Sequence, residues 1–272
     1  MTTAALDAAT LEKLISAAVA VPAIDGSRPW RCRLDPATTT IEVHVAGGRA
    51  PLSADATGQA LHLSAGAAVF NLRAAIAHFG WTPVVELLPD PAEPGFLAAV
   101  RLAGPRPDGN PCDGAELYDA VWRRHSSRFP FDGPPVPGDV RAEITEAATA
   151  EGAILVFAGP QETVRILRLT APDELAALDG RPALAVLGTL HDRPADWLRA
   201  GQGMERALLV ATTHGVRASL LDQAGQRPGL HRSLRDPRGG TAHVQLLIRF
   251  EYGPGGPAAP RRPVGEPPGP TR

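Results

Sequence analysis

Residues able to bind an anion gather where a predicted helix ends. The segment 123–128 reads Arg-Arg-His-Ser-Ser-Arg, and a Phe-Pro-Phe turn follows it at 129–131. Guanidinium groups bind phosphate oxygens through two parallel hydrogen bonds, and hydroxyl and imidazole groups add further donors. A neighbouring helix N-terminus adds backbone N–H groups. The segment therefore predicts a phosphate site, while a solvated, arginine-rich helix end would show the same pattern.

The elements that position this segment alternate between helix and strand. Before residue 104 the hydrophobic periodicity predicts, in order, a helix over 6–20, strands over 31–34 and 40–45, a long helix from Gly58 to His78, and strands over 82–88 and 96–102. We expect Leu61, Ala65, Ala68, Leu72 and Ile76 to form one apolar face of the long helix. Gly80 can adopt the left-handed conformation that ends such a helix.

The second part of the chain has a similar pattern after a Pro- and Gly-rich connector at 104–110. The expected elements are helices over 115–124 and 138–150, a strand over 153–157, a helix over 161–169, a strand over 183–189, a long helix over 196–214 that ends at Gly215, and a strand over 241–252. Interleaved helices and strands predict sheets covered by helices on both faces.

The two parts also resemble each other in sequence. Ala65-Gly66 precedes Gly80 by the same distance at which Ala200-Gly201 precedes Gly215. Arg28-Pro29-Trp30 likewise matches the Arg128-Phe129-Pro130-Phe131 segment. We interpret this as an internal duplication, against chance similarity between two alanine-rich helix pairs. A ligand bound between the halves would then contact residues far apart in sequence.

Composition excludes several classes of function. The chain has 272 residues, 44% of them hydrophobic, and a formal net charge of −2, which disfavours both disorder and broad nucleic-acid binding. Two cysteines lie far apart, and the histidines show no metal-ligand spacing, so no metal site is expected. We expect no signal peptide and no membrane span, and therefore a cytoplasmic protein.

The pattern Arg124-His125-Ser126-x-Arg128 resembles the flavin-phosphate signature of the FMN-dependent nitroreductase family. The chain is more similar still to one subfamily, the Acg-type nitroreductase-like proteins, which contain two fused nitroreductase-like halves. The resemblance covers most of the chain and includes the segments 67–80, 196–221 and 252–264.

This resemblance implies an α/β (α+β) fold, a nitroreductase-like α-β-α sandwich with mixed, mainly antiparallel sheets and two pseudo-repeats in one chain. The implied domains are residues 1–105 for the N-terminal half, 106–252 for the C-terminal half, and 253–272 for a Pro/Gly/Arg-rich arm. The chain would act as a monomeric pseudo-dimer or as a homodimer. A shortened region at 170–181 implies a more open site, or one that a partner covers.

The resemblance also implies a set of FMN-binding residues. Arg124, His125, Ser126 and Arg128 would hold the phosphate, with Arg261 or Arg262 closing over it, and the backbone of Ala218 and Ser219 would contact the edge of the ring. The alternative interpretation is a solvated tail for Arg261 and Arg262 and an ordinary strand or cap hydroxyl for Ser219. No catalytic residue is assigned.

One segment departs from the family pattern. Related chains read roughly Pro-Ser-x-x-Asn-x-Gln-Pro-Trp, whereas residues 22–30 here place Ala23, Gly26 and Arg28 at the Ser, Asn and Gln positions. Neutral amides both donate and accept hydrogen bonds, but an arginine only donates. Arg28 could stabilise an anionic reduced flavin and raise its potential, or it could pair with Asp25 or Asp35 at the surface.

The implied function is an FMN-dependent oxidoreductase of nitroreductase type. Electrons would pass from NAD(P)H to a nitroaromatic, a quinone or a similar small acceptor, and neither nucleic acid nor membrane is an expected partner. The altered 22–30 segment keeps an alternative open, a non-catalytic protein that binds or sequesters flavin, or a scaffold that has lost the cofactor.

Overall fold

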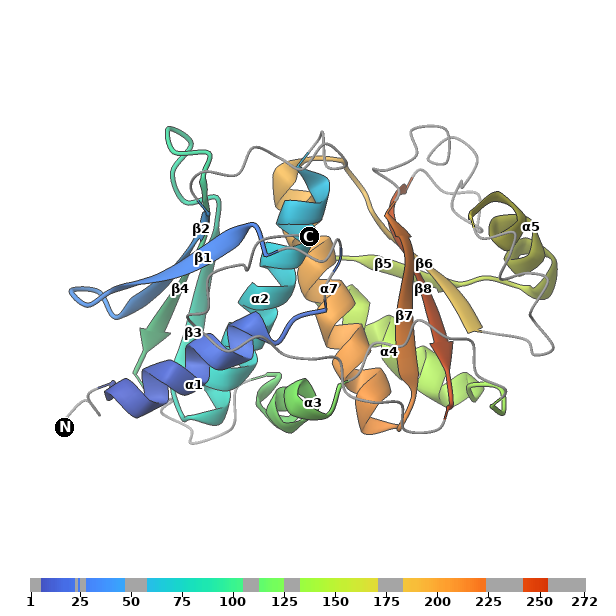
Figure 1. The fold of residues 1–272 in the computed structure, drawn as a ribbon, viewed down its shortest axis with the longest axis horizontal. Coiled ribbons are helices and arrows are strands. Elements are labelled where there is room, and N and C mark those ends of the chain that lie inside the picture. Colours follow the sequence, from blue (N-terminus) through green and yellow to red (C-terminus); the bar gives the residue numbers. More distant parts are fainter. Residues whose placement is uncertain are drawn as a thin grey trace, which may run out of the picture.

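Two antiparallel sheets of four strands each enclose a layer of helices (Figure 1). The structure is a computed structural model that describes residues 6–22, 24, 28–46, 58–104, 113–124, 133–170, 183–223 and 242–253. All strand pairs within these ranges are antiparallel. The α/β class and the antiparallel sheets predicted from the sequence are confirmed.

The first half forms the sheet β1-β2-β4-β3. Its elements are α1 (Ala8–Val19), β1 (Trp30–Asp35), β2 (Thr40–Val45), α2 (Gln59–His78), β3 (Thr82–Leu87) and β4 (Phe96–Ala103). Each lies within one or two residues of its predicted position, because apolar periodicity and glycine or proline boundaries agree along this part of the chain.

The second half forms the sheet β5-β6-β8-β7. Its elements are η1 (Ala115–Leu117), α3 (Tyr118–Arg123), α4 (Gly138–Ala150), β5 (Ile154–Phe157), α5 (Pro160–Thr170), β6 (Ala183–Thr189), α7 (Pro194–Thr213), β7 (Arg217–Gln223) and β8 (His243–Glu251). Strand β7 was not predicted. Its residues were expected only as a segment beside the flavin ring, without a secondary structure.

The two halves repeat one topology. The strand order is the same in both sheets, and each sheet has a register irregularity at the corresponding strand pair, between Val43 and His44 and between Leu187 and Gly188. Gly80 and Gly215, with φ of 91° and 71°, follow α2 and α7 in the same way. Trp81 N donates to Ile76 O, and Val216 N to Ala211 O, which closes both helix ends alike. The two described sheets thus share one topology, as an internal duplication would produce, and the duplication itself stays a prediction.

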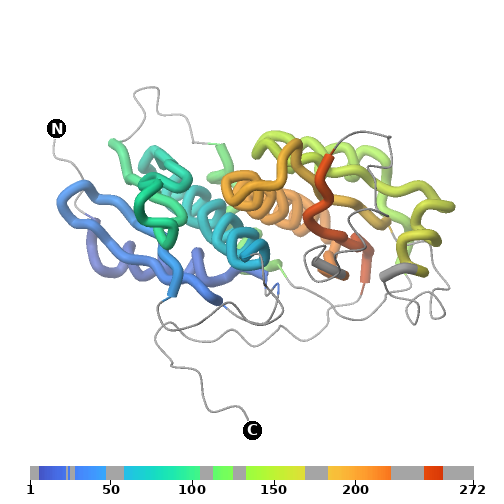
Figure 2. The backbone as a smooth tube through the Cα atoms, turned by 90° about the horizontal axis from the view of Figure 1, so that it is seen from above, coloured from blue at the N-terminus to red at the C-terminus, as the bar shows by residue number. Residues whose placement is uncertain are grey.

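Helices α2 and α7 cross in the centre, where Figure 2 shows them side by side. Each helix has 20 residues, and Gly66 and Gly201 occupy the same position in their respective helices. A Cβ atom on Gly66 would lie 2.2 Å from Leu198 O, and one on Gly201 would lie 2.2 Å from Leu63 O. The crossing therefore requires glycine on both helices. It brings the backbones of the two halves into direct contact.

Helix α2 is buried on almost all sides. The predicted apolar face is buried, with Ala65, Ala68, Leu72 and Ile76 at 0% exposure, and the burial extends well beyond that face. Its alanines and glycine are small enough to let α1, α3, α7 and the first sheet approach from different directions. Within the described residues, it is also the one helix long and apolar enough to cross a membrane by composition, with a mean hydropathy of 1.3. In the structure, 83% of that stretch is buried inside the protein, as in the core helix of a folded domain.

Helices cover the two sheets unequally. Helices α1 and α2 cover the inner face of the first sheet, and α4 and α7 cover the inner face of the second. The outer face of the second sheet packs Leu184, Val186, Val244 and Leu247 against Ile166 and Leu167 of α5. The predicted covering of both faces therefore holds for the second sheet, while the described helices cover one face of the first.

A network of charges bridges the halves beside the helix crossing. Glu151, directly after α4, accepts hydrogen bonds from Arg73 of α2 and from Arg206 of α7, the latter at 2.9 Å. Arg206 also contacts Asp113, with two N–O distances of 2.6 Å. The Glu151 side chain is 6% exposed, so water screens these interactions weakly.

We expect Glu151→Gln to lower the free energy of unfolding by roughly 1–3 kcal/mol. Glutamine has no negative charge, and its NH2 group cannot accept the hydrogen bond of one of the two arginines. Urea denaturation followed by circular dichroism measures this change. The matched control is Glu162→Gln, which removes an exposed pair with Arg165 one helical turn away and is expected to cost less than about 1 kcal/mol. Equal effects of the two substitutions would contradict a specific role for Glu151.

Candidate functional site

Arg124 is the one predicted phosphate-binding residue that lies within the described part of the chain. It follows α3 as the capping residue, and its backbone leaves the helix with φ −63° and ψ 127°. Its N–H still donates to Ala120 O at 2.8 Å. The residue is 9% exposed, so the guanidinium lies inside the protein and is not a solvated helix end.

Arg124 links the phosphate motif to the chain just before the 22–30 segment. Its Nη2 donates to the backbone oxygen of Ala20 over 2.7 Å, although 104 positions separate the two residues. Ala20 directly follows α1 and precedes the 22–30 segment, in which the family pattern is altered. The contact therefore joins the predicted phosphate motif to the chain just before the 22–30 segment, and it is made between the two halves.

A buried carboxylate lies on the other side of Arg124. Glu205 of α7 is 0% exposed, and its Oε1 lies 3.4 Å from Arg124 Nε. Burial raises the pKa of Glu205, and the positive charge of Arg124 and the amide of Asn71 oppose that rise. Asn71 of α2 in turn donates to Ala17 O of α1 at 3.1 Å. Helices α1, α2 and α7 thus meet at one ionic centre.

An apolar cluster lies beside this centre and keeps the local dielectric low. Its members are Ala20, Phe70, Ala74, Leu117, Ala120, Val121 and Leu209. A charge pair in such surroundings is stable only when both partners are present, because either charge alone costs several kcal/mol to bury.

Arg28 lies at the entrance to β1. It is exposed, whereas Trp30 two residues later is buried and donates from Nε1 to Ser64 Oγ at 2.9 Å. Asp35 lies at the opposite end of β1, where its carboxylate accepts from Ala37 N and Thr38 Oγ1. A pair between Arg28 and Asp35 is therefore excluded by the length of the strand, and Asp25 lies outside the described residues.

Ala218 and Ser219 lie on β7 and face opposite sides of the second sheet. Ala218 packs against the main core, whereas Ser219 is 6% exposed and lies opposite Arg249 of β8. Arg249 Nη2 and Ser219 Oγ are 3.5 Å apart. The Ser219 side chain thus acts as a strand hydroxyl beside an arginine, and its backbone role toward a flavin stays a prediction.

The remaining predicted site residues, His125, Ser126, Arg128, Arg261 and Arg262, lie outside the described residues. Sequence reasoning missed several buried charges, Glu205 and Arg249 among them. Arg249 interrupts the apolar run of β8 and pairs with Glu251, which was a usable signal, whereas an acid within a helix usually indicates a solvated face.

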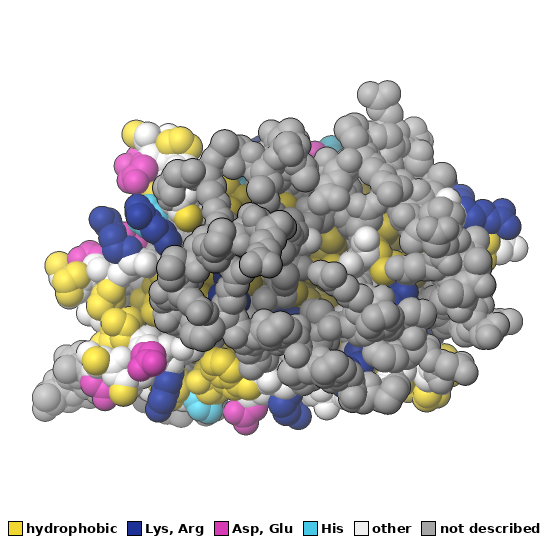
Figure 3. All heavy atoms as spheres, in the orientation of Figure 1, with side chains coloured by type: hydrophobic (Ala, Val, Ile, Leu, Met, Phe, Trp, Pro, Cys, Tyr) yellow, Lys and Arg dark blue, Asp and Glu magenta, His cyan; other side chains and the backbone are white. Residues whose placement is uncertain are grey.

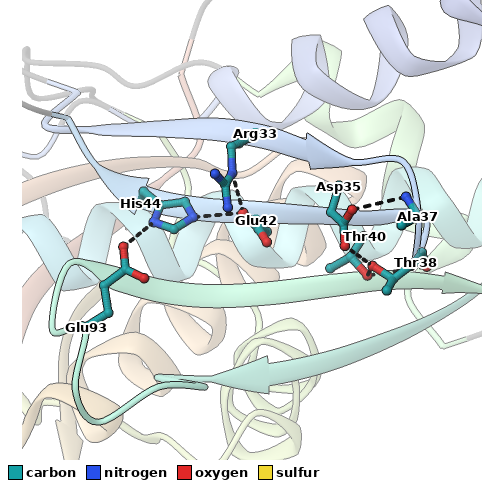
Figure 4. Close-up of polar contacts among 8 residues, drawn as sticks. All are labelled: Arg33, Asp35, Ala37, Thr38, Thr40, Glu42, His44 and Glu93. Carbon is teal, nitrogen blue, oxygen red and sulfur yellow. Dashed lines mark hydrogen bonds and ion pairs between the residues drawn. The ribbon is translucent and has the colours of Figure 1, made fainter.

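A separate cluster of polar side chains lies on the outer face of the first sheet (Figure 4). Glu42 accepts from Arg33 at 2.7 Å and contacts His44 Nε2 at 3.0 Å, and these bonds hold the pKa of Glu42 below its usual value. His44 also stacks on Phe96 with ring centroids 4.5 Å apart. Figure 3 shows basic and acidic side chains interspersed over this region, an arrangement typical of a charge-paired surface.

Comparisons with known proteins agree with the motifs. No family model matches the chain. It is 25% identical to "Putative NAD(P)H nitroreductase Rv3131" of Mycobacterium tuberculosis, with 96% of this chain and 91% of that protein aligned. It is 24% identical to "Putative NAD(P)H nitroreductase acg" of the same organism, with 94% of each chain aligned.

Among solved structures, a nitroreductase from Desulfovibrio desulfuricans in complex with FMN is 18% identical, with a TM-score of 0.44 over 57% of this chain and 98% of that one. The resemblance stated from the motifs is confirmed: over nearly its whole length the chain is similar to the Acg-type nitroreductase-like proteins.

Proposed function

We propose that the chain is an FMN-dependent oxidoreductase of nitroreductase type that passes electrons from NAD(P)H to a nitroaromatic, a quinone or a similar acceptor. The names of its relatives support this class. The observation that carries the proposal is the hydrogen bond from Arg124 to Ala20, because it brings the predicted phosphate motif next to the chain that leads into the 22–30 segment. We further propose residues 1–105 and 106–252 as the two halves, and 253–272 as an arm.

The donor chemistry fits an FMN phosphate. A phosphate monoester carries nearly two negative charges, and removing it from water is offset only by several charge-assisted donors. Arg124, His125, Ser126 and Arg128 offer two guanidinium groups, an imidazole and a hydroxyl within five consecutive residues, and Arg261 or Arg262 would add a third guanidinium. The burial of Arg124 strengthens any such interaction, since little water screens it.

FMN, when bound, supplies the chemistry of hydride acceptance and electron transfer. The contribution of the chain is to bind and orient the cofactor and to tune its electronics. Arg124 would fix the phosphate end, while the backbone of Ala218 and Ser219 would contact the edge of the ring system. Arg28, as a cation with donors only, would favour a reduced, negatively charged ring.

Arg28→Gln tests this last role. We expect the two-electron potential of the bound flavin to fall by roughly 10–30 mV, which corresponds to the loss of one screened charge interaction at an exposed position. Spectroelectrochemical titration of the purified flavoprotein measures it. The control is Arg33→Gln, which removes a cation of the same strand region that is paired with Glu42. An unchanged potential in Arg28→Gln would contradict the role.

The absorption spectrum tests the function as a whole. Purified protein that shows flavin bands, and loses them when NADH or NADPH is added without oxygen, supports the oxidoreductase. Yellow protein that does not react would favour flavin storage. Colourless protein that does not bind added FMN would favour a scaffold that has lost the cofactor.

A further inference from the structure

Burying the carboxylate of Glu205 costs free energy. It is fully buried on α7, and its helical neighbours Met204, Leu208 and Leu209 pack into the apolar interior. Replacing a buried ion pair by apolar side chains of similar volume often leaves stability unchanged or raises it. Stability alone therefore gives a weak reason for an acid here, and a directional role for its interaction with Arg124 is the better explanation.

Two protein groups face one edge of the Arg124 guanidinium. Its Nη2 donates to Ala20 O at 2.7 Å, whereas its Nε lies 3.4 Å from Glu205 Oε1 and forms an ion pair without a hydrogen bond. Nε and Nη2 share one edge of the planar guanidinium, so two protein groups on different helices engage that edge. The hydrogen bond to Ala20 fixes one donor, and the attraction of the buried Glu205 carboxylate holds the Nε side of the same edge toward α7, so the two groups together restrict rotation of the guanidinium plane.

Helices of both halves fix the position of Glu205. Helix α7, which carries Glu205, crosses α2 at the Gly66–Gly201 contact. Asn71 of α2 lies beside Glu205 and donates to Ala17 O of α1. These elements belong to both halves of the chain, so the orientation of Arg124 depends on how the halves pack together.

We propose that Glu205 is a positioning residue for the flavin phosphate: it holds the guanidinium of Arg124 in the orientation in which that group binds the phosphate. The proposal rests on the proposed function. It assigns to α7, a helix outside the phosphate motif, control over how tightly the phosphate end of the cofactor is held.

The test compares two ligands that differ only in the phosphate. The dissociation constants of FMN and of riboflavin are measured by fluorescence quenching for the whole chain, stripped of cofactor, as wild type and as Glu205→Asp. Aspartate keeps the charge but withdraws the carboxylate by one methylene, so any effect reports geometry. We expect the preference for FMN over riboflavin to fall roughly tenfold, as for the loss of one charge-assisted contact, with riboflavin binding unchanged.

Glu205→Leu, which removes the acceptor while keeping side-chain volume, is expected to lower the preference further. If it does not fold, Glu205→Asp decides the question alone. The matched control is Glu151→Gln, which alters another buried carboxylate between the halves that binds Arg73 and Arg206, and should leave the preference unchanged. A purely structural role for Glu205 predicts equal weakening of FMN and riboflavin, and that result would overturn the proposal.

The wild-type measurement tests the phosphate site separately from the role of Glu205. Wild-type protein that binds FMN no better than riboflavin would refute the phosphate site, and with it the role of Glu205. Wild-type protein that prefers FMN, together with Glu205 variants that keep the full preference, would overturn the positioning role and leave the proposed function standing.

Discussion

Replacing Arg124 with alanine is expected to destabilise the folded chain by about 3–5 kcal/mol, because the carboxylate of Glu205 would then be buried without its cation. Burial already raises the pKa of Glu205, and removal of Arg124 removes the largest opposing influence. The folded variant therefore binds a proton more readily than the unfolded one. Its stability should fall as the pH rises above the ordinary pKa of a glutamate, more steeply than that of the wild type.

Urea denaturation at several pH values measures this effect. The control is the double variant Arg124→Ala/Glu205→Leu, which removes both charges and is expected to recover most of the lost stability. If the double variant is as unstable as the sum of the single changes, the two side chains do not form a coupled pair.

The same substitution bears on the cofactor. Arg124→Ala combined with Arg128→Ala is expected to abolish FMN retention, since each charge-assisted contact contributes roughly 1.5–3 kcal/mol. Retention is measured as flavin released by acid per chain, in protein whose fold is verified by circular dichroism. Retention at the wild-type level would place the phosphate elsewhere.

Gly66→Ala is expected to have the second large effect, roughly 3 kcal/mol of lost stability or a failure to fold. The added Cβ would lie 2.2 Å from the backbone oxygen of Leu198 and 3.0 Å from the Cα of Gly201, and neither atom can rotate away. Relief requires α2 and α7 to move apart, which opens contacts along the whole interface between the halves.

The melting temperature and the urea midpoint report this change. Gly201→Ala meets the same obstacle at Leu63 O and should behave alike, which tests the symmetry of the crossing. Gly104→Ala is the matched control, since a Cβ there meets nothing within 4 Å, and it should shift stability by less than about 0.5 kcal/mol. Wild-type stability in Gly66→Ala would mean that the helices are not held at this distance.

The sequence alone determined most of the secondary structure. The bounds of α4 and β6 match their predictions residue for residue, and Gly80 and Gly215 end the long helices as expected. These features follow from local physics, the period of apolar residues and the backbone freedom of glycine, which a linear pattern records directly. The repeat was visible for the same reason, because Gly66 and Gly201 have the same local sequence context.

Only the tertiary structure decided how these elements are used. A helix rich in alanine has the same pattern whether one side or every side is buried, and α2 proved to be covered almost all round. An arginine at a helix end has the same identity in water and in the interior, and Arg124 proved to be buried between Ala20 and Glu205. Those partners come from α7 and from the end of α1, far along the chain, and sequence patterns carry local preferences but no record of which distant groups share one low-dielectric centre.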